Sequence, residues 1–213
     1  MDPEVANVKS GTRRDKALAT RAAIIRAAHE EFTRHGFHGA TIAQIAARAG
    51  VAPQTVYFTF HTKPELMSAV IDNAVMGDDP VPPQATAWWA AMTAAERADD
   101  ALTIFIRGAA PLFARASAVS EILRAAAWTD DEVRATYQVH ENLRTEAFGQ
   151  VVQILADKGP LRPGLTIDTA TDILMTIFGD STYHQLTTEH AWTHDQVVAW
   201  LCQALPDLLL QTR

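Results

Sequence analysis

Apolar residues along the chain recur at spacings of three and four, which is the period of a helix that buries one side. No segment shows the sustained apolar–polar alternation of a half-buried strand, and alanine is abundant throughout. Before residue 77 this pattern predicts helices over residues 16–35, 41–49, 53–59 and 63–76. After residue 77 it predicts helices over residues 84–96, 99–116, 117–127, 130–158, 166–189 and 194–211. The pattern therefore predicts an all-α protein.

A break in the helical pattern at residues 77–84 divides the chain, because the segment reads GDDPVPPQ. Its three prolines lack the backbone donor that a helix interior requires. We expect three regions: a flexible basic arm over residues 1–15, a first helical domain with a linking helix over residues 16–76, and a second helical domain over residues 77–213.

Composition and charge suit a globular protein with two unlike parts. The 213 residues are 48% hydrophobic and 20% charged, which excludes a disordered chain. The formal net charge is −7, but residues 1–76 carry 9 basic and 7 acidic side chains, whereas the rest of the chain carries 9 and 18. This asymmetry favours a small basic module joined to an acidic one, although ordinary solvated surface charge produces the same counts.

The sequence offers little for metal, cofactor or membrane chemistry. The single cysteine, Cys202, cannot form an intramolecular disulfide or a multi-thiolate metal site. His184, His190 and His194 are close in sequence, but a helix start at Thr193 separates the last one, so we expect no metal site. Motifs for a phosphate loop or a nucleophilic serine are absent, and we expect no cofactor and no catalytic residues. No apolar run or secretory segment is long enough to predict a membrane association, so we expect a cytoplasmic protein.

Residues 41–60 carry the most specific local pattern and read TIAQIAARAGVAPQTVYFTF. Thr41 suits the N-cap of a short helix, and Gly50 can take the left-handed conformation that ends it. Pro53 suits the first turn of a second helix, in which Val56 and Phe60 lie one turn apart on the inner side. Two short helices joined by a tight glycine turn form a helix-turn-helix.

The outer face of the second helix carries uncharged side chains that can form hydrogen bonds: Gln54, Thr55, Tyr57 and Thr59. Glutamine can form two hydrogen bonds with adenine, and threonine offers a hydroxyl and a methyl group that suit thymine. Thr41 and Lys63 stand at helix N-termini, where hydroxyl, ammonium and backbone N–H groups suit phosphate oxygens. The pattern favours a surface for duplex DNA, and a helical corner that merely exposes polar residues stays open as the alternative.

Residues 20–71 resemble the N-terminal domain of the tetracycline-repressor (TetR) family of transcription regulators. The shared features lie at fixed spacing: AA-x-x-x-F at 27–32, the glycine–phenylalanine turn at 36–37, IA-x-x-AGV at 45–51, TVY at 55–57, and Phe60, Lys63, Glu65 and Leu66. The resemblance implies a homodimer whose two third helices enter neighbouring major grooves of an operator. It implies DNA contacts at Thr41, Gln54, Thr55, Tyr57, Thr59, His61 and Lys63. One departure is Ala52, where the family often has a capping Ser or Thr.

The resemblance also implies that residues 77–213 bind a small-molecule effector and dimerise. The predicted helix over residues 130–158 has an apolar stripe that His140 and Arg144 interrupt, and neighbouring helices supply aromatic side chains. We expect an effector pocket lined by Phe105, Phe113, Trp128, Tyr137, His140, Arg144, Phe148, Met175 and Phe178. Aromatic stripes at helical spacing are more often plain core, so that alternative stays open. The apolar stripe of the last helix similarly suits either a dimer interface or an intramolecular core.

Together these features predict a ligand-responsive transcriptional regulator, a repressor, that binds a palindromic operator as a homodimer and is released by a small-molecule effector. One alternative is a helix-turn-helix DNA-binding protein or activator that responds to no effector. A second is an all-helical enzyme, which would need a catalytic group of polar residues that the sequence does not display.

Overall fold

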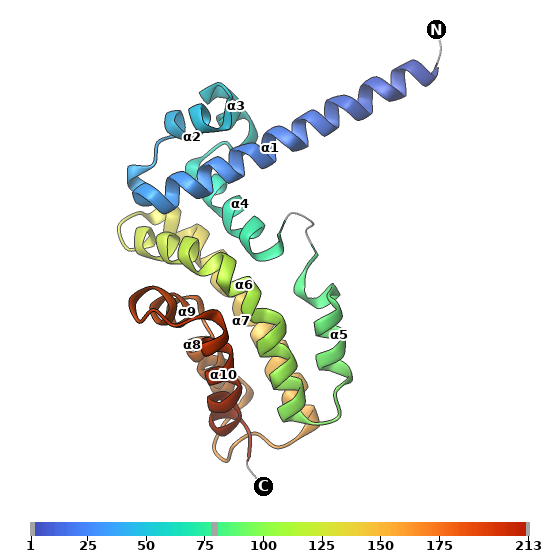
Figure 1. Ribbon diagram of the computed structural model, residues 1–213, viewed down its shortest axis with the longest axis vertical. Coiled ribbons are helices and arrows are strands. Elements are labelled where there is room, and N and C mark those ends of the chain that lie inside the picture. Colours follow the sequence, from blue (N-terminus) through green and yellow to red (C-terminus); the bar gives the residue numbers. More distant parts are fainter. Residues whose placement is uncertain (1–2, 78–80, 212–213) are drawn as a thin grey trace. The chain divides into compact units, whose positions relative to one another are not determined.

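The computed structural model describes residues 3–77 and 81–211, with side chains from residue 13 onward. Figure 1 shows this part of the chain as helices joined by loops. It contains ten α-helices, two short helical turns and no strand, with one isolated antiparallel bridge between Leu161 and Leu210. The chain divides into two compact units, Met1–Ile71 (unit 1) and Asp72–Arg213 (unit 2). The all-α prediction is confirmed. The division falls inside helix α4 (Lys63–Met76) rather than in the segment 77–84, of which residues 78–80 lie outside the described residues.

Helix α1 (Pro3–Gly39) begins earlier than predicted, so the expected flexible arm is helical over residues 3–15. Pro3 stands in the first turn, where proline is tolerated, and the single glycine at position 11 does not interrupt the helix. Near the other end, Gly36 has φ 69° and ψ 175° and kinks the helix. The turn predicted at residues 36–37 is therefore a kink, and the helical element continues past it to Gly39.

In unit 1, α1 packs against α2 (Ile42–Ala49), and α2 packs against α3 (Pro53–Phe60). Arg21 of α1 lies over the ring of Phe60 at the end of α3, and Lys63 at the start of α4 lies over the ring of Phe37 of α1. The core of unit 1 consists of side chains that are almost completely buried: Ile24, Phe32, Ile45, Val56, Leu66 and Met67. Each helix contributes one or two of these residues at helical spacing, because only one side of each helix faces the others. The short helices α2 and α3 thus depend on α1 for their burial.

A buried carboxylate fixes α2 on α1. Glu31 is only 4% exposed, and the guanidinium of Arg48 donates from Nε to its Oε1 at 2.5 Å and from Nη1 to Glu30 Oε2 at 2.7 Å. His35 Nε2 lies 3.5 Å from the other oxygen of Glu31. Because a buried carboxylate is costly without a partner, this pairing specifies the position of Arg48 and with it the orientation of α2.

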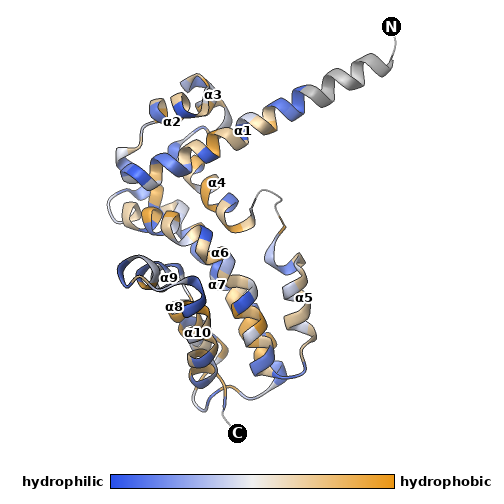
Figure 2. Ribbon diagram, viewed as in Figure 1, coloured by the Kyte–Doolittle hydropathy of each residue, from blue (hydrophilic) through white to orange (hydrophobic). Residues whose placement is uncertain are grey.

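Unit 2 is built around α6 (Ala98–Ala127). This helix packs against α5, α7, α9 and α10, and the residues that it buries are apolar apart from Ser117. Figure 2 shows hydrophobic residues interspersed with hydrophilic ones along the helix. The other elements of unit 2 are η1 (Pro83–Ala85), α5 (Ala87–Ala94), α7 (Asp131–Lys158), α8 (Ile167–Ile177), α9 (Asp180–His184), η2 (Gln185–Glu189) and α10 (His194–Leu209). By length and composition α6 alone among the described helices could cross a membrane, but half of its most apolar window is buried inside the unit. Its apolar character is explained by that core position.

Two predicted helix boundaries in unit 2 are wrong. Residues 99–116 and 117–127 form the single helix α6, because no helix-breaking residue separates them. The predicted helix over residues 166–189 instead breaks after α8, where Phe178 leaves the helical conformation. A Cβ atom at Gly179 would collide with the carbonyl oxygen of Met175, so this bend requires glycine.

Candidate functional site

The corner between α2 and α3 is defined by local hydrogen bonds. Thr41 Oγ1 accepts from the backbone N–H of Gln44 at 3.2 Å, and the Gln44 side chain accepts from the backbone N–H of Thr41 at 2.8 Å. Gly50 then takes the left-handed conformation (φ 70°, ψ 30°), and the N–H of Val51 donates to the carbonyl of Ala46 at 3.0 Å. These reciprocal caps satisfy both ends of α2 and fix the direction in which α3 departs. The predicted helix-turn-helix is present.

Helix α3 turns two of the predicted DNA-contacting side chains fully outward. Val56 and Phe60 are buried, whereas Gln54 and Tyr57 are exposed, the latter by 53%. Thr55 is half-buried on the side of the helix. Ala52 is the N-cap of α3 and makes no side-chain hydrogen bond, as expected for an alanine where the TetR family often has a capping Ser or Thr. Pro53 occupies the first turn. Gln54 and Tyr57 are therefore the residues best placed to contact a partner.

The remaining predicted contacts are more peripheral. Thr59 is half-buried, and its hydroxyl donates to the carbonyl of Thr55 at 2.7 Å, so it is partly used within the helix. His61 is exposed and ends α3 with a positive φ of 51°, a backbone conformation uncommon outside glycine. Lys63 is half-buried, with its ammonium 4.6 Å from the ring centroid of Phe37. Thr41 is exposed and already serves as a cap, which leaves it at the edge of the surface.

Phe58 is a residue of this surface that the sequence interpretation missed. It is 86% exposed and lies between Gln54 and His61 on the outer side of α3. Its position midway between the buried Val56 and Phe60 contained the signal, because a helical residue two positions from each faces away from both.

The surface lies in a stretch without acidic residues. From residue 32 to residue 64 the sequence contains Arg34, Arg48 and Lys63 but no aspartate or glutamate, and of these cations Arg48 is already paired with Glu30 and Glu31. The absence of carboxylates over this stretch leaves this part of unit 1 attractive to a polyanion, even though the whole chain is acidic. Shape, exposed hydrogen-bonding groups and charge thus coincide on α2, α3 and the start of α4.

In unit 2, four of the predicted pocket residues form one cluster of touching rings. The ring centroid of Phe105 lies 5.5 Å from that of Phe148 and 5.6 Å from that of Phe178, with the planes nearly perpendicular. The ring centroid of Phe113 lies 4.6 Å from that of Phe178. All four side chains are buried. The rings contact one another, which is how aromatic side chains fill a core.

Helix α5 packs closely against α6 beside this cluster, with Trp88 of α5 against Phe105 and Gly108 of α6. Trp88 lies 6.2 Å from Phe105 between ring centroids, and a Cβ atom at Gly108 would collide with the Trp88 ring. Glycine at position 108 is thus required by the indole that lies against it.

Other predicted pocket residues lie elsewhere. Trp128 is 76% exposed at the C-terminal end of α6, so it does not line an interior cavity of unit 2. Its side chain is outside because the helix ends there and the chain turns toward α7. Tyr137 is half-buried, and burial raises the pKa of its hydroxyl. Met175 is half-buried against the core.

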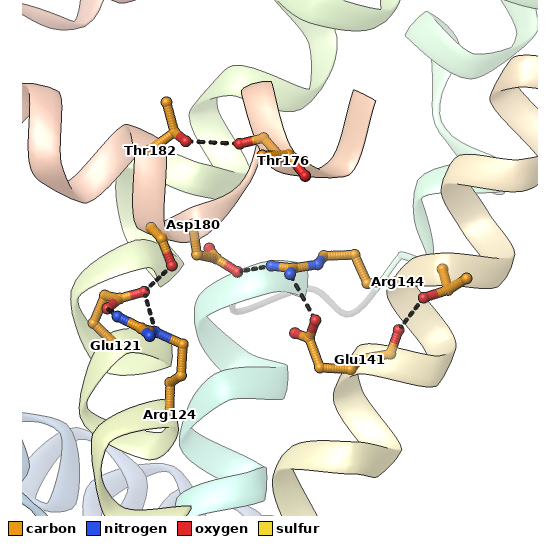
Figure 3. A network of polar contacts seen from close by, with 9 residues as sticks. Glu121, Arg124, Glu141, Arg144, Thr176, Asp180 and Thr182 are labelled. Carbon is orange, nitrogen blue, oxygen red and sulfur yellow. Dashed lines mark hydrogen bonds and ion pairs between the residues drawn. The ribbon is translucent and has the colours of Figure 1, made fainter. Parts of the chain in front are cut away.

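Arg144 belongs to a network of charged side chains that joins α6, α7 and α9 (Figure 3). Its Nη1 donates to Asp180 at 2.5 Å and its Nη2 donates to Glu141 at 2.8 Å. Nearby, Arg124 donates to Glu121, and the hydroxyl of Ser181 donates to the same carboxylate at 2.5 Å. The network holds three carboxylates for two guanidinium groups, so it is not a free cationic site for an anionic ligand.

Burial shapes the electrostatics of this network. Desolvation raises the pKa of Asp180, and the neighbouring Arg144 offsets only part of that effect. The Nε atom of Arg144 is buried and finds no hydrogen-bond acceptor among the described residues. The guanidinium is therefore held mainly by its two carboxylates, and it ties α7 to α9.

His140 pairs with α4 rather than with the aromatic cluster. Its Nδ1 lies 3.9 Å from Asp72 Oδ1, and burial lowers the pKa of the imidazole, an effect that the Asp72 carboxylate partly opposes. Nearby on α6, Arg115 donates to the carbonyls of Ala74 and Val75, both at 2.9 Å. These contacts fix the last turn of α4 within unit 2.

The apolar stripe predicted on the last helix is buried inside the chain itself. Val197, Leu201 and Leu205 are almost fully buried in the core of unit 2, while Ala204 and Leu208 are half-buried. Among the described residues no group of three or more His, Cys, Asp or Glu side chains is arranged to hold a metal ion. His194 instead pairs with Tyr183, whose hydroxyl lies 2.8 Å from its Nδ1.

Comparison with known proteins finds a similarity that is confined to residues of unit 1. Residues 24–70 match the family model for bacterial regulatory proteins, tetR family. The HTH-type transcriptional regulator TtgR of Pseudomonas putida is 40% identical over 60 residues, which cover 28% of this chain and 29% of that protein. The chain therefore matches less than a third of the length of this curated relative.

Comparison with solved structures extends the similarity to the fold of the whole chain. FadR from Bacillus subtilis, solved in complex with stearoyl-CoA, has a TM-score of 0.69 and 18% sequence identity. The match covers 90% of this chain and 99% of the FadR chain. NalD, the secondary repressor of the MexAB-OprM multidrug efflux pump in Pseudomonas aeruginosa, has a TM-score of 0.65 and 24% sequence identity. This match covers 91% of this chain and 98% of the NalD chain. At these identities the likeness concerns the fold. It confirms an N-terminal helix-turn-helix unit followed by a helical unit.

Proposed function

We propose that this chain, whose residues 24–70 belong to the tetR family of bacterial regulatory proteins, is a transcriptional regulator that binds duplex DNA through α3. The observation that carries the proposal is the capped corner of α2 and α3, which presents Gln54 and Tyr57 to solvent in a stretch free of acidic residues. Glutamine and tyrosine can donate hydrogen bonds to base edges or phosphates. Supporting contacts at the edges of this surface would come from Thr41, Thr55, Thr59, His61 and Lys63.

The proposed form on DNA is a homodimer on a palindromic operator. A helix of eight residues is only about 12 Å long, so one copy contacts few base pairs. Two copies on half-sites about 34–36 Å apart, or a multiple of that distance, would provide the specificity that a genome requires. Because the α10 stripe is buried within one chain, the dimer rests on the family resemblance and not on that stripe.

The proposed regulation is release from the operator by a small-molecule effector that binds unit 2, which makes the chain a repressor acting in the cytoplasm rather than an enzyme. FadR was solved with stearoyl-CoA and NalD is a repressor, which supports a regulator of this type. An effector acts only through its different affinities for two conformations, and the coupling is typically about 1–3 kcal/mol. The aromatic cluster would then have to open in the effector-bound conformation, because its rings contact one another here.

Selection from a random duplex library tests the proposal directly. Full-length protein is incubated with duplexes that carry a random central segment, bound DNA is amplified over several rounds, and the enriched sequences are footprinted. We expect an enriched palindrome and a protected region on it. We expect Tyr57→Ala and Lys63→Ala to lose tight binding to that palindrome while sedimentation shows an unchanged oligomeric state. Recovery of no enriched sequence would contradict the proposed function.

The alternative of a DNA-binding protein without an effector makes a different prediction. Titration of the preformed complex with a panel of acyl-CoA thioesters and hydrophobic drugs would leave the anisotropy of labelled operator unchanged. Release by any one of these compounds would favour the effector-responsive regulator.

A further inference from the structure

Phe58 is the most exposed of the large apolar side chains on the described part of the chain. It is 86% exposed, compared with 76% for Trp128 and 58% for Leu18. Its ring contributes nothing to the core of unit 1, and no acidic residue lies within six positions of it on either side in the sequence. The fold therefore gives no reason for a phenylalanine at this position.

The position of Phe58 is central on the proposed DNA surface. It lies two residues from both buried side chains of α3, and each residue advances the helix by about 100°, so it points about 160° away from Val56 and Phe60. Gln54 precedes it by one turn and His61 follows it by nearly one turn, and both are exposed. Any duplex that contacts Gln54 and Tyr57 must also approach this ring.

A phenyl ring cannot form the hydrogen bonds that distinguish most base edges. In the major groove the apolar group of the base pairs is the 5-methyl group of thymine, and phenylalanine is one of the side chains that contact it. We propose that Phe58 determines specificity by contacting a thymine methyl group in each half-site. This inference rests on the proposed function of α3 as a DNA-binding helix.

The test uses operator duplexes in which thymine is replaced by deoxyuridine, which keeps every hydrogen-bonding group and removes only the methyl group. Starting from the palindrome enriched by the random library, each thymine is replaced in turn, symmetrically in both half-sites. For the natural protein we expect one replacement to weaken binding about fourfold per methyl group, the effect of burying one apolar carbon. For Phe58→Ala we expect weaker binding to the thymine duplex and no further loss on that replacement.

Two control variants separate a contact from a general effect of the substitution. Leu18→Ala removes another exposed apolar side chain of unit 1, on α1, and we expect it to keep both the affinity and the dependence on the methyl group. Phe58→Leu keeps an apolar side chain, and we expect it to retain a preference for thymine over deoxyuridine. Circular dichroism of each variant establishes that the helical content is unchanged.

Three results would overturn the inference while leaving the proposed function intact. The first is an enriched palindrome at which no thymine methyl affects binding. The second is a dependence on the methyl group that persists unchanged in Phe58→Ala. The third is a loss of the preference for thymine in Phe58→Leu as complete as that in Phe58→Ala. Failure to enrich any sequence would overturn the proposed function, and this inference with it.

Discussion

The candidate sites of the two units differ in how far apart in the sequence their residues lie. The DNA surface of unit 1 is formed between Thr41 and Lys63, and most of its geometry follows from hydrogen bonds between residues three to five positions apart. The aromatic cluster of unit 2 joins Phe105, Phe148 and Phe178, which come from three different parts of the chain. The first arrangement is encoded locally, and the second exists only once the whole unit has folded.

This difference decides what each set of residues contributes. Gln54 and Tyr57 of α3 can be exchanged without loss of core packing, because both side chains are exposed. A ring of the unit 2 cluster cannot, because its neighbours are other buried rings. Substitutions on the exposed side of α3 should therefore change binding at constant stability, whereas substitutions in the aromatic cluster of unit 2 should change stability first.

The largest effect is expected for Phe178→Ala. Its ring is fully buried against Phe105 and Phe113, so its removal should lower the free energy of unfolding by about 3–5 kcal/mol. All five tryptophans lie in unit 2, so denaturant unfolding followed by intrinsic fluorescence measures this unit. Trp128→Ala is the control, because this exposed residue should change the free energy by at most about 0.5 kcal/mol. A loss below about 1 kcal/mol for Phe178→Ala would indicate an open pocket instead of a packed core.

The sequence predicted the local features of unit 1 better than the long-range packing of unit 2. Thr41, Gly50 and the buried pair Val56 and Phe60 were identified because caps, turns and helical spacing are local signals. Whether an aromatic residue of unit 2 lines a pocket or fills the core depends on which helices meet, and a stripe of side chains on one helix does not contain that information. Trp128 shows the limit of such reasoning, since its side chain at the end of α6 is exposed on the surface of unit 2.

Arg144→Ala should have a smaller effect and lower the free energy of unfolding by about 2–3 kcal/mol at neutral pH. Removal of the guanidinium leaves the Asp180 carboxylate buried without its cation. The pKa of Asp180 is already raised by burial and should rise further in the variant. In the variant, Asp180 then binds a proton more tightly in the folded state than in the unfolded state. Protonation of Asp180 therefore stabilises the folded variant at low pH, and this stabilisation is lost as the pH rises through the pKa of Asp180 in the folded state. The deficit relative to the natural protein should thus shrink as pH falls from about 7 to about 5.

Urea unfolding at several pH values, followed by tryptophan fluorescence, measures this deficit. Arg97→Ala provides the matched control, because Arg97 pairs with Asp99 on the exposed surface of the same unit, where an ion pair contributes at most about 1 kcal/mol. A deficit for Arg144→Ala that stays constant with pH would show that Asp180 is not the group left unpaired.

In unit 1, Gln54→Ala should weaken operator binding about tenfold, which is about 1.4 kcal/mol, with stability changed by at most about 0.5 kcal/mol. Because the Gln54 side chain is exposed, we expect the substitution to remove hydrogen bonds to DNA and to leave the core unchanged. Fluorescence anisotropy with the selected palindrome measures the affinity at a stated salt concentration, since phosphate contacts make it salt-dependent. Gln203→Ala, an exposed glutamine on α10, should leave the affinity unchanged. Equal affinities for both variants would remove Gln54 from the DNA surface.

Ala52→Ser should have the smallest effect, and it tests whether a capping side chain changes the local stability of α3. Helix α3 begins without a side-chain cap, whereas Thr41 caps α2. A serine hydroxyl at position 52 can accept from a backbone N–H in the first turn of α3, which should stabilise the helix by about 0.5–1 kcal/mol. Amide hydrogen exchange in α3 should slow by about two- to fivefold, while Thr41→Ala should accelerate exchange in α2. Unchanged exchange in Ala52→Ser would mean that Pro53, with its φ already fixed, makes a capping hydroxyl redundant.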